Sequence, residues 1–451
     1  MRRYRVWLAV GGLAALLGVP VSLRAQGYSV NEHGTCAMGR AGTATASPCA
    51  DGSAMFYNPA GLAGLGKGHG LITAGGTGII ATGGFKADDG GTADLNKKLI
   101  PVPHLYAAYG VTDKIAAGIG LFAPYGLETN WDENGLARFR GYRSVIRNVY
   151  IQPTVAIRLH PKIDFGVGFD YNISHVQLQQ HLDLSEQSVP PGLFPGSVQT
   201  FADVGILPGT DFADANLHGN GHSVGYHLGL IVRPADRVSL GVRYLSRQRS
   251  EIDNATAEFT QINTNILLGG LPLDQQLAAQ FGAGAPLGKQ DASTVLRLPE
   301  QLSFGAAVDV TKQFRALVDV VTTNWKVFDT LALDLVGAGR INLPQDNKRT
   351  WAYRIGGEYL VSEGTVVRLG YINHTAAAPD QTVVPNLPEG PRAEFTGGLG
   401  AKLGEKLHVD LAYQYIKQQE RRGRTVSDPA VTNGLFTFNA HLIGATFTYS
   451  F

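Results

Sequence analysis

The chain has 451 residues, and its 38 Lys and Arg nearly balance its 37 Asp and Glu, which leaves a formal net charge of +1 at pH 7. This balance excludes the basic surplus on which nucleic-acid binding depends, so we expect no nucleic-acid partner. Glycine, with 57 residues, is nearly twice as frequent as in an average protein. The length would suffice for two soluble domains, but no linker interrupts the chain, which favours one large unit.

The first 25 residues have the features of an export signal. Arg2, Arg3 and Arg5 precede an apolar run from Val6 to Leu17, and Ala25 offers a small residue for cleavage. The run is shorter than the roughly 20 residues of a membrane-spanning helix, although an uncleaved anchor stays open as the alternative. We predict that residues 1–25 are a signal peptide.

Residues 26–67 are rich in Gly, Ala, Ser and Thr and show almost no hydrophobic periodicity. Such a segment has no core of its own, but small side chains let its backbone pack closely against surrounding walls. We predict that it is a hatch, a plug inside a barrel formed by residues 68–451. Asn58-Pro59 punctuates the segment, because the residue before proline is pushed out of the helical region; by itself this pair is an ordinary turn signal.

Both cysteines of the chain, Cys36 and Cys49, lie in this segment. In an oxidising periplasm a pair at this spacing is expected to be bridged rather than free, although the sequence leaves both states open. A bridge would close a loop of about 14 residues and stabilise the fold by roughly 3 kcal/mol in the entropic model.

After residue 67, apolar and polar residues alternate through one segment after another. The clearest run extends from Ile163 to Ser174, and two further runs cover 238–244 and 408–415. Strict alternation gives a strand one apolar and one polar face. A soluble sandwich turns its apolar faces inward and a transmembrane barrel turns them outward, so alternation alone does not separate the two.

The lengths of the connections separate them. Short polar turns lie at 112–114, 160–162, 234–236, 311–312, 362–364 and 404–405, and longer connections lie at 86–101, 127–143, 185–220, 263–293, 336–348, 377–392 and 420–433. Short and long connections alternate, as periplasmic turns and outer loops do in an outer-membrane barrel. We predict an all-β fold, a transmembrane antiparallel β-barrel of about 14 strands with an N-terminal hatch, whose closure satisfies the backbone in lipid.

The chain ends in alternating aromatic residues, with Phe447, Tyr449 and Phe451 on one face. In bacterial barrels such an end resembles the signal read by the outer-membrane barrel assembly machinery, which is therefore a predicted partner. Just upstream, the apolar residues fall in the opposite phase; they are Phe436, Phe438, Ala440 and Leu442. This phase predicts either a bulge or an apolar patch that faces the lumen.

No arrangement of residues indicates catalysis. His218, His222 and His227 are close in sequence but lack the fixed geometry of metal ligands. No Gly-x-Ser-x-Gly nucleophile motif occurs. We expect no enzyme activity, no cofactor and no metal site.

Two of the long outer connections, 185–220 and 263–293, are unusually apolar. Their candidate substrate-binding residues are Leu193, Phe194, Phe201, Leu273, Leu277 and Phe281. The last three follow at intervals of four, the spacing of one stripe on a short helix. Either the two loops pack on each other and cap the barrel, or they expose a groove that captures apolar ligands.

A series of short motifs completes the sequence evidence. They are Asn31-Glu32, Gly39-Arg40-Ala41, Asp51, Asn58-Pro59-Ala60, Val102-Pro103, Tyr125-Gly126-Leu127, Leu298-Pro299-Glu300 and Tyr353-Arg354-Ile355. In this order the chain resembles the outer-membrane transporters of long-chain fatty acids and aromatic hydrocarbons, the FadL/TodX-like proteins. The resemblance covers essentially the whole mature chain, and places Asn31, Glu32, Gly39, Arg40, Asn58, Pro59 and Ala60 in the hatch.

The resemblance implies energy-independent uptake of a hydrophobic small molecule across the outer membrane of a Gram-negative bacterium. In the family, the outer loops form a landing site, and an aromatic residue at the position of Tyr28 contacts ligand in an inner pocket. The third strand kinks inward, here at Pro124, Tyr125 and Gly126, and opens a lateral gate towards the outer-membrane lipids.

One position departs from the family's best-known members. They bind the fatty-acid carboxylate with a basic side chain at the outer end of the fifth strand, where this chain reads Gln177-Leu178-Gln179-Gln180-His181. Whether the ligand is a fatty acid or a neutral hydrocarbon therefore stays open. So does a different class of function, a barrel that serves as an adhesin or structural protein. A general porin is less favoured, because it needs no long plug of small residues.

Overall fold

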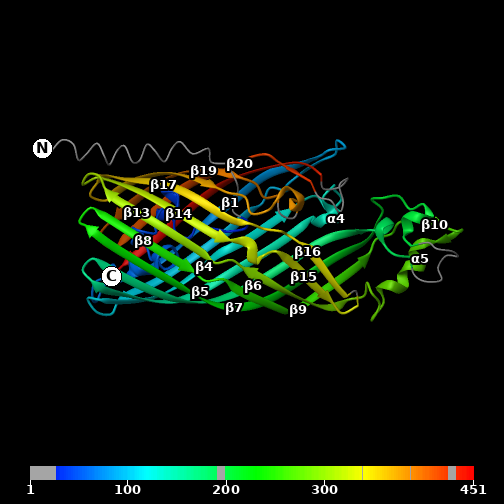
Figure 1. Cartoon of the computed structure of the whole chain (residues 1–451), viewed down its shortest axis with the longest axis horizontal. Coiled ribbons are helices and arrows are strands. Elements are labelled where there is room, and N and C mark those ends of the chain that lie inside the picture. Colours follow the sequence, from blue (N-terminus) through cyan, green and yellow to red (C-terminus); the bar gives the residue numbers. More distant parts are fainter. Residues whose placement is uncertain (1–26, 190–198, 338, 386–387, 425–432) are drawn as a thin grey trace.

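The computed structural model describes residues 27–189, 199–337, 339–385, 388–424 and 433–451. The predicted signal peptide and the loop residues Leu193 and Phe194 lie outside these ranges. The strands wrap into a barrel with the tight turns and the C-terminus at one end and the longest loops at the other (Figure 1).

The wall of the barrel is one sheet of 14 antiparallel strands, as predicted. It closes because the first strand, β1 (Gly70–Ala87), pairs along its length with the last, β22 (Gly434–Ser450). The strands between them are β3 (Leu99–Gly110), β4 (Ile115–Asn130), β5 (Arg143–His160), β6 (Ile163–Asp183), β7 (Asp211–Ala235), β8 (Val238–Leu245), β9 (Gln248–Gln261), β12 (Gln290–Leu298), β13 (Gln301–Asp309), β14 (Phe314–Asn324), β15 (Thr330–Leu335), β16 (Gly339–Pro344), β17 (Arg349–Ser362), β18 (Thr365–His374), β19 (Arg392–Leu403) and β20 (Leu407–Gln418).

Several wall strands are interrupted and therefore carry two labels. The pairs are β8 with β9, β12 with β13, β14 with β15, and β16 with β17. Two short strands, β2 (Thr92–Asp94) and β21 (Arg421–Gly423), add to the outer ends of β1 and β22.

The direction of the side chains identifies the barrel as a membrane protein. In β6, Phe169, Tyr171 and Ile173 point outward and are 53%, 39% and 46% exposed, whereas Asp170 and Asn172 point into the lumen and are fully buried. Apolar residues on the outside and polar residues on the inside are the pattern of a transmembrane barrel and the reverse of a soluble sandwich.

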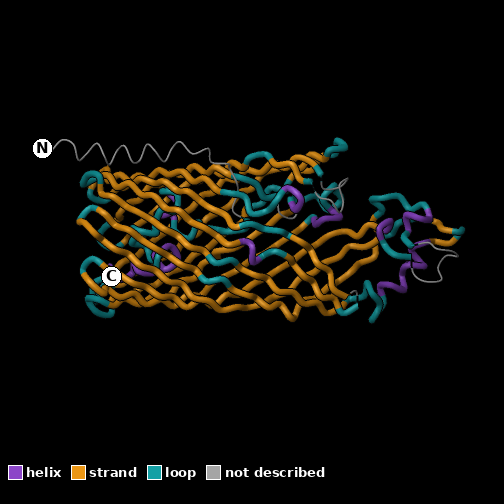
Figure 2. The backbone as a smooth tube through the Cα atoms, viewed as in Figure 1, coloured by secondary structure: helices purple, strands orange, loops and turns teal. Residues whose placement is uncertain are grey.

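The hatch, residues 27–67, lies inside the barrel in the half nearer the tight turns (Figure 2). Its helices are α2 (Thr35–Gly39), α3 (Ala54–Tyr57) and the 3₁₀ helix η2 (Pro59–Gly64). Nearly every residue from Tyr28 to Ala63 is buried. Among the helices that the structure describes, none is long and apolar enough to cross a membrane.

Glycines of the wall explain how the hatch fits and why the chain contains so many. A Cβ on Gly166 would lie 2.3 Å from the carbonyl carbon of Pro59, one on Gly241 would lie 2.1 Å from the carbonyl oxygen of Thr45, and one on Gly356 would lie 2.4 Å from the carbonyl oxygen of Arg40. Equivalent clashes would occur at Gly229, Gly305 and Gly370. The hatch backbone therefore lies directly against the backbone of the wall, with no room for side chains between them.

The outer loops carry the remaining elements. They are α4 (Arg138–Gly141), η3 (Leu184–Glu186), η4 (Phe201–Val204), β10 (Leu267–Leu268), β11 (Leu271–Pro272), α5 (Leu273–Leu277), η5 (Ala278–Phe281), η6 (Trp325–Val327) and η7 (Asp380–Thr382). The loop predicted for 185–220 is shorter than expected, because β6 and β7 stay paired as far as Asp183 with Asp211. Residues 184–210 alone form this connection.

The opposite phase in β22 reflects a lumen-facing apolar patch. Phe436, Ala440 and Leu442 are buried inside the barrel, and β22 pairs with β1 without a register shift. No bulge is therefore needed, and the inner face of this strand is apolar near its outer end.

Candidate ligand cavity and lateral window

The ladder between β3 and β4 is incomplete. The two strands pair from Gly110 with Ala116 up to Leu105 with Leu121. Beyond that point, within the described residues, no register pair joins them, although β3 extends outward to Leu99 and β4 to Asn130. We call the unpaired stretch, between residues 99–104 of β3 and 122–130 of β4, the window.

Prolines account for the missing ladder on both sides of the window. Pro101 and Pro103 lie in β3 and Pro124 lies in β4, and proline has no N–H to donate across a strand pair. The pairing of β4 with β5 shifts register between Phe122 and Tyr125, which places a kink at Pro124. The predicted gate residues Pro124, Tyr125 and Gly126 therefore lie at the kink.

The N-terminal arm of the hatch, residues 27–33, pairs with the kinked part of β4. The amide of Val30 donates to the carbonyl of Pro124, and the amide of Gly126 donates to the carbonyl of Tyr28, both at 2.9 Å. These bonds satisfy backbone groups of β4 that β3 leaves unpaired. The position of the kink is thus coupled to the position of the arm.

Tyr28 anchors the arm in a group of aromatic rings. Its ring centroid lies 4.4 Å from that of Trp325, 5.5 Å from Phe328 and 6.4 Å from Tyr125. The Tyr125 hydroxyl donates to the carbonyl of Pro299 at 2.7 Å. Edge-to-face aromatic packing of this kind fixes orientation as well as burying apolar area.

A cavity of about 280 Å³ lies behind the window. Its wall includes both edges of the window, at 100–103 and at 123–129, and the arm from Gly27 to Val30. The other apolar side chains that line it are Ile79, Ile146, Val149, Ile416, Phe438 and Leu442. A cavity with mostly apolar walls and a few polar groups is the usual form of a small-molecule site, and this volume is near the lower end of the usual range.

Glu32 and Arg392, which line the cavity, belong to a polar network that continues behind its wall. The amide group of Gln414 donates to Glu32 at 3.0 Å and to Glu394 at 2.6 Å. Arg392 pairs with Glu394 at 2.8 Å, and His374 contacts the same carboxylate at 3.1 Å. Burial raises the pKa of Glu32, and the neighbouring Glu394 raises it further.

Glu389 ties the arm to the outer loop between β18 and β19. Its carboxylate accepts the amide hydrogens of Gly27, Ala377 and Ala378 at 2.9 to 3.0 Å. Burial raises the pKa of this carboxyl, while the three backbone hydrogen bonds act in the opposite direction. The arm therefore connects the cavity with the outer surface.

The hatch proper is held by polar side chains of its own motif residues. The side-chain amide of Asn58 donates to the carbonyls of Thr45 at 2.6 Å, Leu230 at 3.2 Å and Val242 at 3.3 Å. Its Oδ1 accepts the amide of Ala60 and so caps η2, where Pro59 is the first residue. The Asn58-Pro59-Ala60 motif thus joins two parts of the hatch to β7 and β8.

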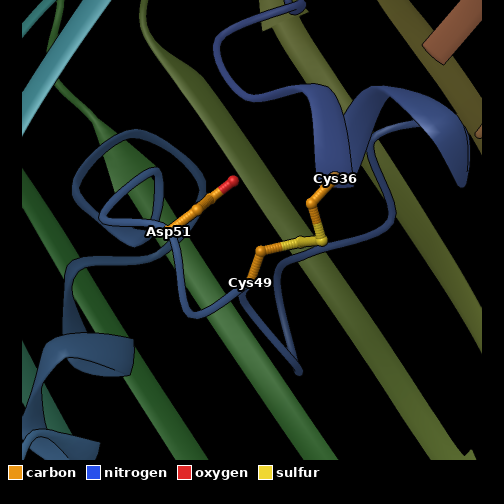
Figure 3. Close-up of side chains that lie close together, drawn as sticks. All are labelled: Cys36, Cys49 and Asp51. Carbon is orange, nitrogen blue, oxygen red and sulfur yellow. A yellow bond between two sulfur atoms is a disulfide. The ribbon is translucent and has the colours of Figure 1, made fainter. Parts of the chain in front are cut away.

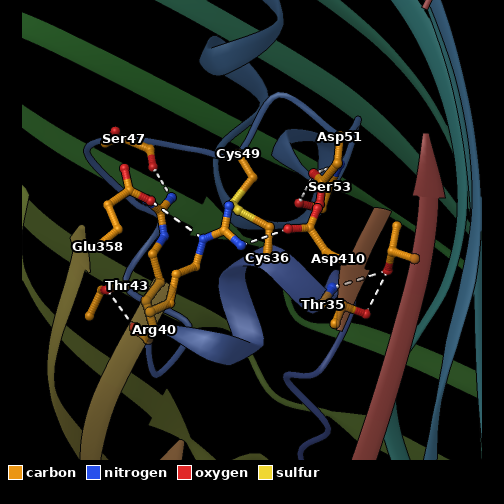
Figure 4. Close-up of a disulfide and its surroundings, with 12 residues drawn as sticks. Thr35, Cys36, Arg40, Thr43, Ser47, Cys49, Asp51, Ser53, Glu358 and Asp410 are labelled. Carbon is orange, nitrogen blue, oxygen red and sulfur yellow. Dashed lines mark hydrogen bonds and ion pairs between the residues drawn. A yellow bond between two sulfur atoms is a disulfide. The ribbon is translucent and has the colours of Figure 1, made fainter. Parts of the chain in front are cut away.

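Arg40 performs a similar role on the other side of the lumen (Figure 4). It pairs with Glu358 of β17 at 2.8 Å and donates to the carbonyl of Ser47. Gly39 touches Gly398 of β19, because a Cβ on either glycine would lie 2.9 Å from the other's Cα.

Cys36 and Cys49 form a disulfide that joins α2 to the loop before α3. Among the described residues, Cys36, Cys49 and Asp51 are the group of possible metal ligands that lie close together (Figure 3). Both sulfurs are committed to the disulfide, so this group has no thiolate to offer a metal.

The two apolar outer loops fold together into a lobe, defined here as residues 184–189, 199–210 and 262–289, which projects beyond the barrel (Figure 1). Phe201, Leu273 and Leu277 are buried in its core, and Phe281 packs against it. These four predicted capture residues therefore contact one another rather than solvent. Exposed apolar side chains lie beside them on the hairpin of β10 and β11, where Leu267 and Leu271 are 68% and 63% exposed.

At the outer end of β6, the fifth strand, no described side chain is a free cation. His181 contacts Asp211 at 2.9 Å, and Gln177 donates to Asn216 at 3.2 Å. The polar residues Gln177 and His181, which stand where the family's best-known members have a basic side chain, are therefore hydrogen-bonded to side chains of β7.

Sequence reasoning missed Trp325, Phe328 and Glu389, which form the contacts of the arm. They lie in the break between β14 and β15 and in a loop, where no periodic pattern marks them. Pro101 and Pro103 could have been identified, because two prolines two residues apart in a strand pattern indicate an edge without a partner.

The chain matches the family described as outer membrane protein transport protein (OMPP1/FadL/TodX) over residues 18–451. A putative outer membrane protein of Neisseria meningitidis is 24% identical over 95% of this chain and 96% of its own length. The long-chain fatty acid transport protein of Escherichia coli is 23% identical over 94% of each chain. Among solved structures, a FadL homologue of Pseudomonas aeruginosa superposes with a TM-score of 0.76 at 20% identity, covering 94% of this chain and 99% of that one.

Proposed function

Since the chain belongs to the OMPP1/FadL/TodX family of outer-membrane transport proteins, we propose that it takes up small hydrophobic molecules across the outer membrane by energy-independent diffusion. Relatives named for fatty acid transport and for toluene transport support this proposal. The observation that carries it is the apolar cavity, whose wall includes both unpaired edges of the window.

The proposed route begins at the lobe and ends in the bilayer. The lobe exposes Leu267 and Leu271 for first contact, and its buried neighbours Leu273, Leu277 and Phe281 keep that surface in shape. From there the ligand reaches the cavity beside Tyr28. A straight path into the periplasm would move apolar surface into water, which is unfavourable. Exit through the window would deliver the ligand to the hydrocarbon region of the membrane.

The hatch supports a sideways route, because it fills the lumen below the cavity. Its backbone lies against wall glycines on β6, β7, β8, β17 and β18, so little space separates the two there. A separate cavity of about 670 Å³ lies between hatch and wall beside Cys36, Arg40 and Arg368, and it shares no lining residue with the cavity behind the window. Opening a path past the wall glycines would require the separation of backbone surfaces on several strands at once.

The window needs a smaller change. No β3–β4 register pair spans the described residues that border it, and the contacts to separate there are the two hydrogen bonds of the arm to β4, the Lys98–Glu128 ion pair and the hydrogen bond from the amide of Asn96 to the carbonyl of Asn130.

A cross-link across the window tests this route. Continuing the β3–β4 register from Leu105 with Leu121 brings position 103 opposite position 123. Cysteines at these two positions, joined by a disulfide or a short reducible bismaleimide, should block uptake of a radiolabelled apolar ligand, and reduction should restore it. The matched control joins cysteines at Ala107 and Ile119, where the ladder is already complete, and should transport normally.

Uptake at the normal rate through the cross-linked window would refute lateral exit. Wild-type protein treated with the same reductant controls for loss of the Cys36–Cys49 disulfide. The adhesin alternative is tested separately by deletion of residues 28–60: a transporter changes its permeability while the barrel still assembles, and an adhesin does not.

A further inference from the structure

The charges around the cavity bear on a question that the uptake function leaves open, namely the class of ligand. We infer that the enclosed part of the cavity selects uncharged hydrophobic molecules over carboxylate anions, an inference that rests on the proposed uptake function.

The inner wall carries more acidic than basic groups. Glu32, Glu389 and Arg392 line it, and the acid behind Arg392 is its partner Glu394. Arg421 is 3.6 Å from Glu389 and is itself directed at Asp380 and at the carbonyl of Ala378. Each arginine of this group thus has a carboxylate of the protein beside it.

A ligand carboxylate would have to compete for these arginines. It would enter an apolar cavity lined by Glu32, which shares the amide of Gln414 with Glu394 behind the wall. Placing a further negative charge there without an opposite charge of its own carries a large desolvation penalty. A neutral ligand of the same shape carries none, so the cavity favours it.

A surplus of positive charge lies at the outer rim of the window, where Arg147 and Glu128 line the cavity. Lys98 and Arg147 both contact Glu128, at 2.6 and 3.0 Å, and their side chains are 48% and 58% exposed. Lys98 and Arg147 are largely solvated and share one acid. Their positive charge is therefore screened by water and acts on the rim more than on the enclosed part of the cavity. The preference for uncharged ligands therefore concerns binding beside Tyr28 and not the first encounter with the surface.

Two ligands with the same chain length, one with a neutral and one with an anionic head group, test the inference. Full-length barrel in nanodiscs is titrated by calorimetry at pH 8 with octan-1-ol and with octanoate. We expect octan-1-ol to bind at least about tenfold more tightly, since an unpaired charge in an apolar site carries a desolvation penalty. Equal or tighter binding of octanoate would overturn the inference while leaving uptake intact. Failure of both ligands to bind would instead count against the proposed function.

Two variants connect the preference to these charges. Glu32→Gln removes one acid from the cavity and Leu127→Lys adds one base to it, and each should raise the ratio of octanoate to octanol affinity by about threefold or more. Glu363→Gln makes the same change as the first variant in an exposed turn at the far end of the barrel and should leave the ratio at its wild-type value. An unchanged ratio in both cavity variants would overturn the inference. Leu127→Lys decides the matter if Glu32→Gln fails to fold.

Discussion

The hatch contains two regions that are held in different ways. From residue 34 to residue 64, its backbone lies against wall glycines, and Asn58, Arg40 and Asp319 bond it to several strands. From residue 27 to residue 33, the arm contacts one kinked strand, a loop carboxylate and a group of aromatic rings. Since the first region is fixed on many sides and the second mainly by the elements that border the cavity, we expect ligand-linked movement in the arm and the window.

The largest effect is expected from a side chain placed between hatch and wall. Gly241→Val would put Cβ 2.1 Å from the carbonyl oxygen of Thr45. The atoms nearest to this Cβ belong to the hatch backbone, so no side chain can move aside to make room. Overpacking of this kind costs about 1–3 kcal/mol in a side-chain core, and more when backbone must move. The hatch should fail to seat, and the folded band on a gel should convert to the unfolded band at a lower temperature than in the wild type. Gly397→Ala is the control, because its Cβ would meet its nearest neighbour at 3.7 Å.

The second-largest effect is expected where the first and last strands meet. There β1 and β22 form a complete ladder, unlike the strands that border the window. Phe451 exchanges two hydrogen bonds with Gly70, at 2.8 and 3.0 Å, and its ring is half exposed on the outer face. Phe451→Asp should reduce insertion into the outer membrane severalfold, whereas Phe451→Tyr should preserve it. Normal amounts of folded Phe451→Asp barrel in membrane fractions would show that the terminal aromatic is not read during assembly.

A moderate effect is expected at the anchor of the hatch. Asn58→Ala leaves the carbonyls of Thr45, Leu230 and Val242 without their donor, at a cost of about 1–3 kcal/mol for buried unpaired groups. The barrel should still fold, its thermal unfolding should begin earlier, and uptake should fall. Asn134→Ala, in an exposed loop, is the matched control. Wild-type uptake by a folded Asn58→Ala barrel would reduce Asn58 to a turn residue.

The smallest effect is expected in the lobe, where buried and exposed residues can be separated. Replacing Leu267 and Leu271 with Ser removes exposed apolar surface and should slow uptake at low ligand concentration more than at saturation, since capture scales with apolar area at roughly 25 cal/mol per Å². Replacing Leu273, Leu277 and Phe281 with Ser should instead loosen the lobe, measured by proteolysis. If only the second set alters uptake, the lobe acts through its packing and not through a capture surface.

The sequence alone predicted the closed barrel and the number of strands. It also predicted that the short turns lie at one end of the barrel and the long loops at the other. Alternation with period two and the alternation of short and long connections are local properties, so they are visible without a fold. The motif Asn58-Pro59-Ala60 and the kink at Pro124 were identified through the family resemblance; the local effect of proline by itself predicted only a turn at the first and a bend at the second.

Other features depended on pairs of residues far apart in the chain. Leu273 and Leu277 read as a helical stripe, but whether that stripe faced solvent or Phe201 could be decided only when two loops were brought together. The wall glycines looked like ordinary polar-face positions of a strand until the hatch backbone was found against them. The contact of Gly27 with Glu389 spans 362 positions.

What the sequence by itself determined about this protein is therefore the barrel, the hatch and their order along the chain. Backbone closure in lipid leaves few alternatives once the alternating strands are recognised. Only the tertiary structure decided that the arm occupies the place of β3 beside β4, and that the arginines lining the cavity, Arg147 and Arg392, each pair with a carboxylate of the protein. The physical reason is that hydrogen bonds and ion pairs between distant segments depend on register and on the shape of the lumen, neither of which a local pattern encodes.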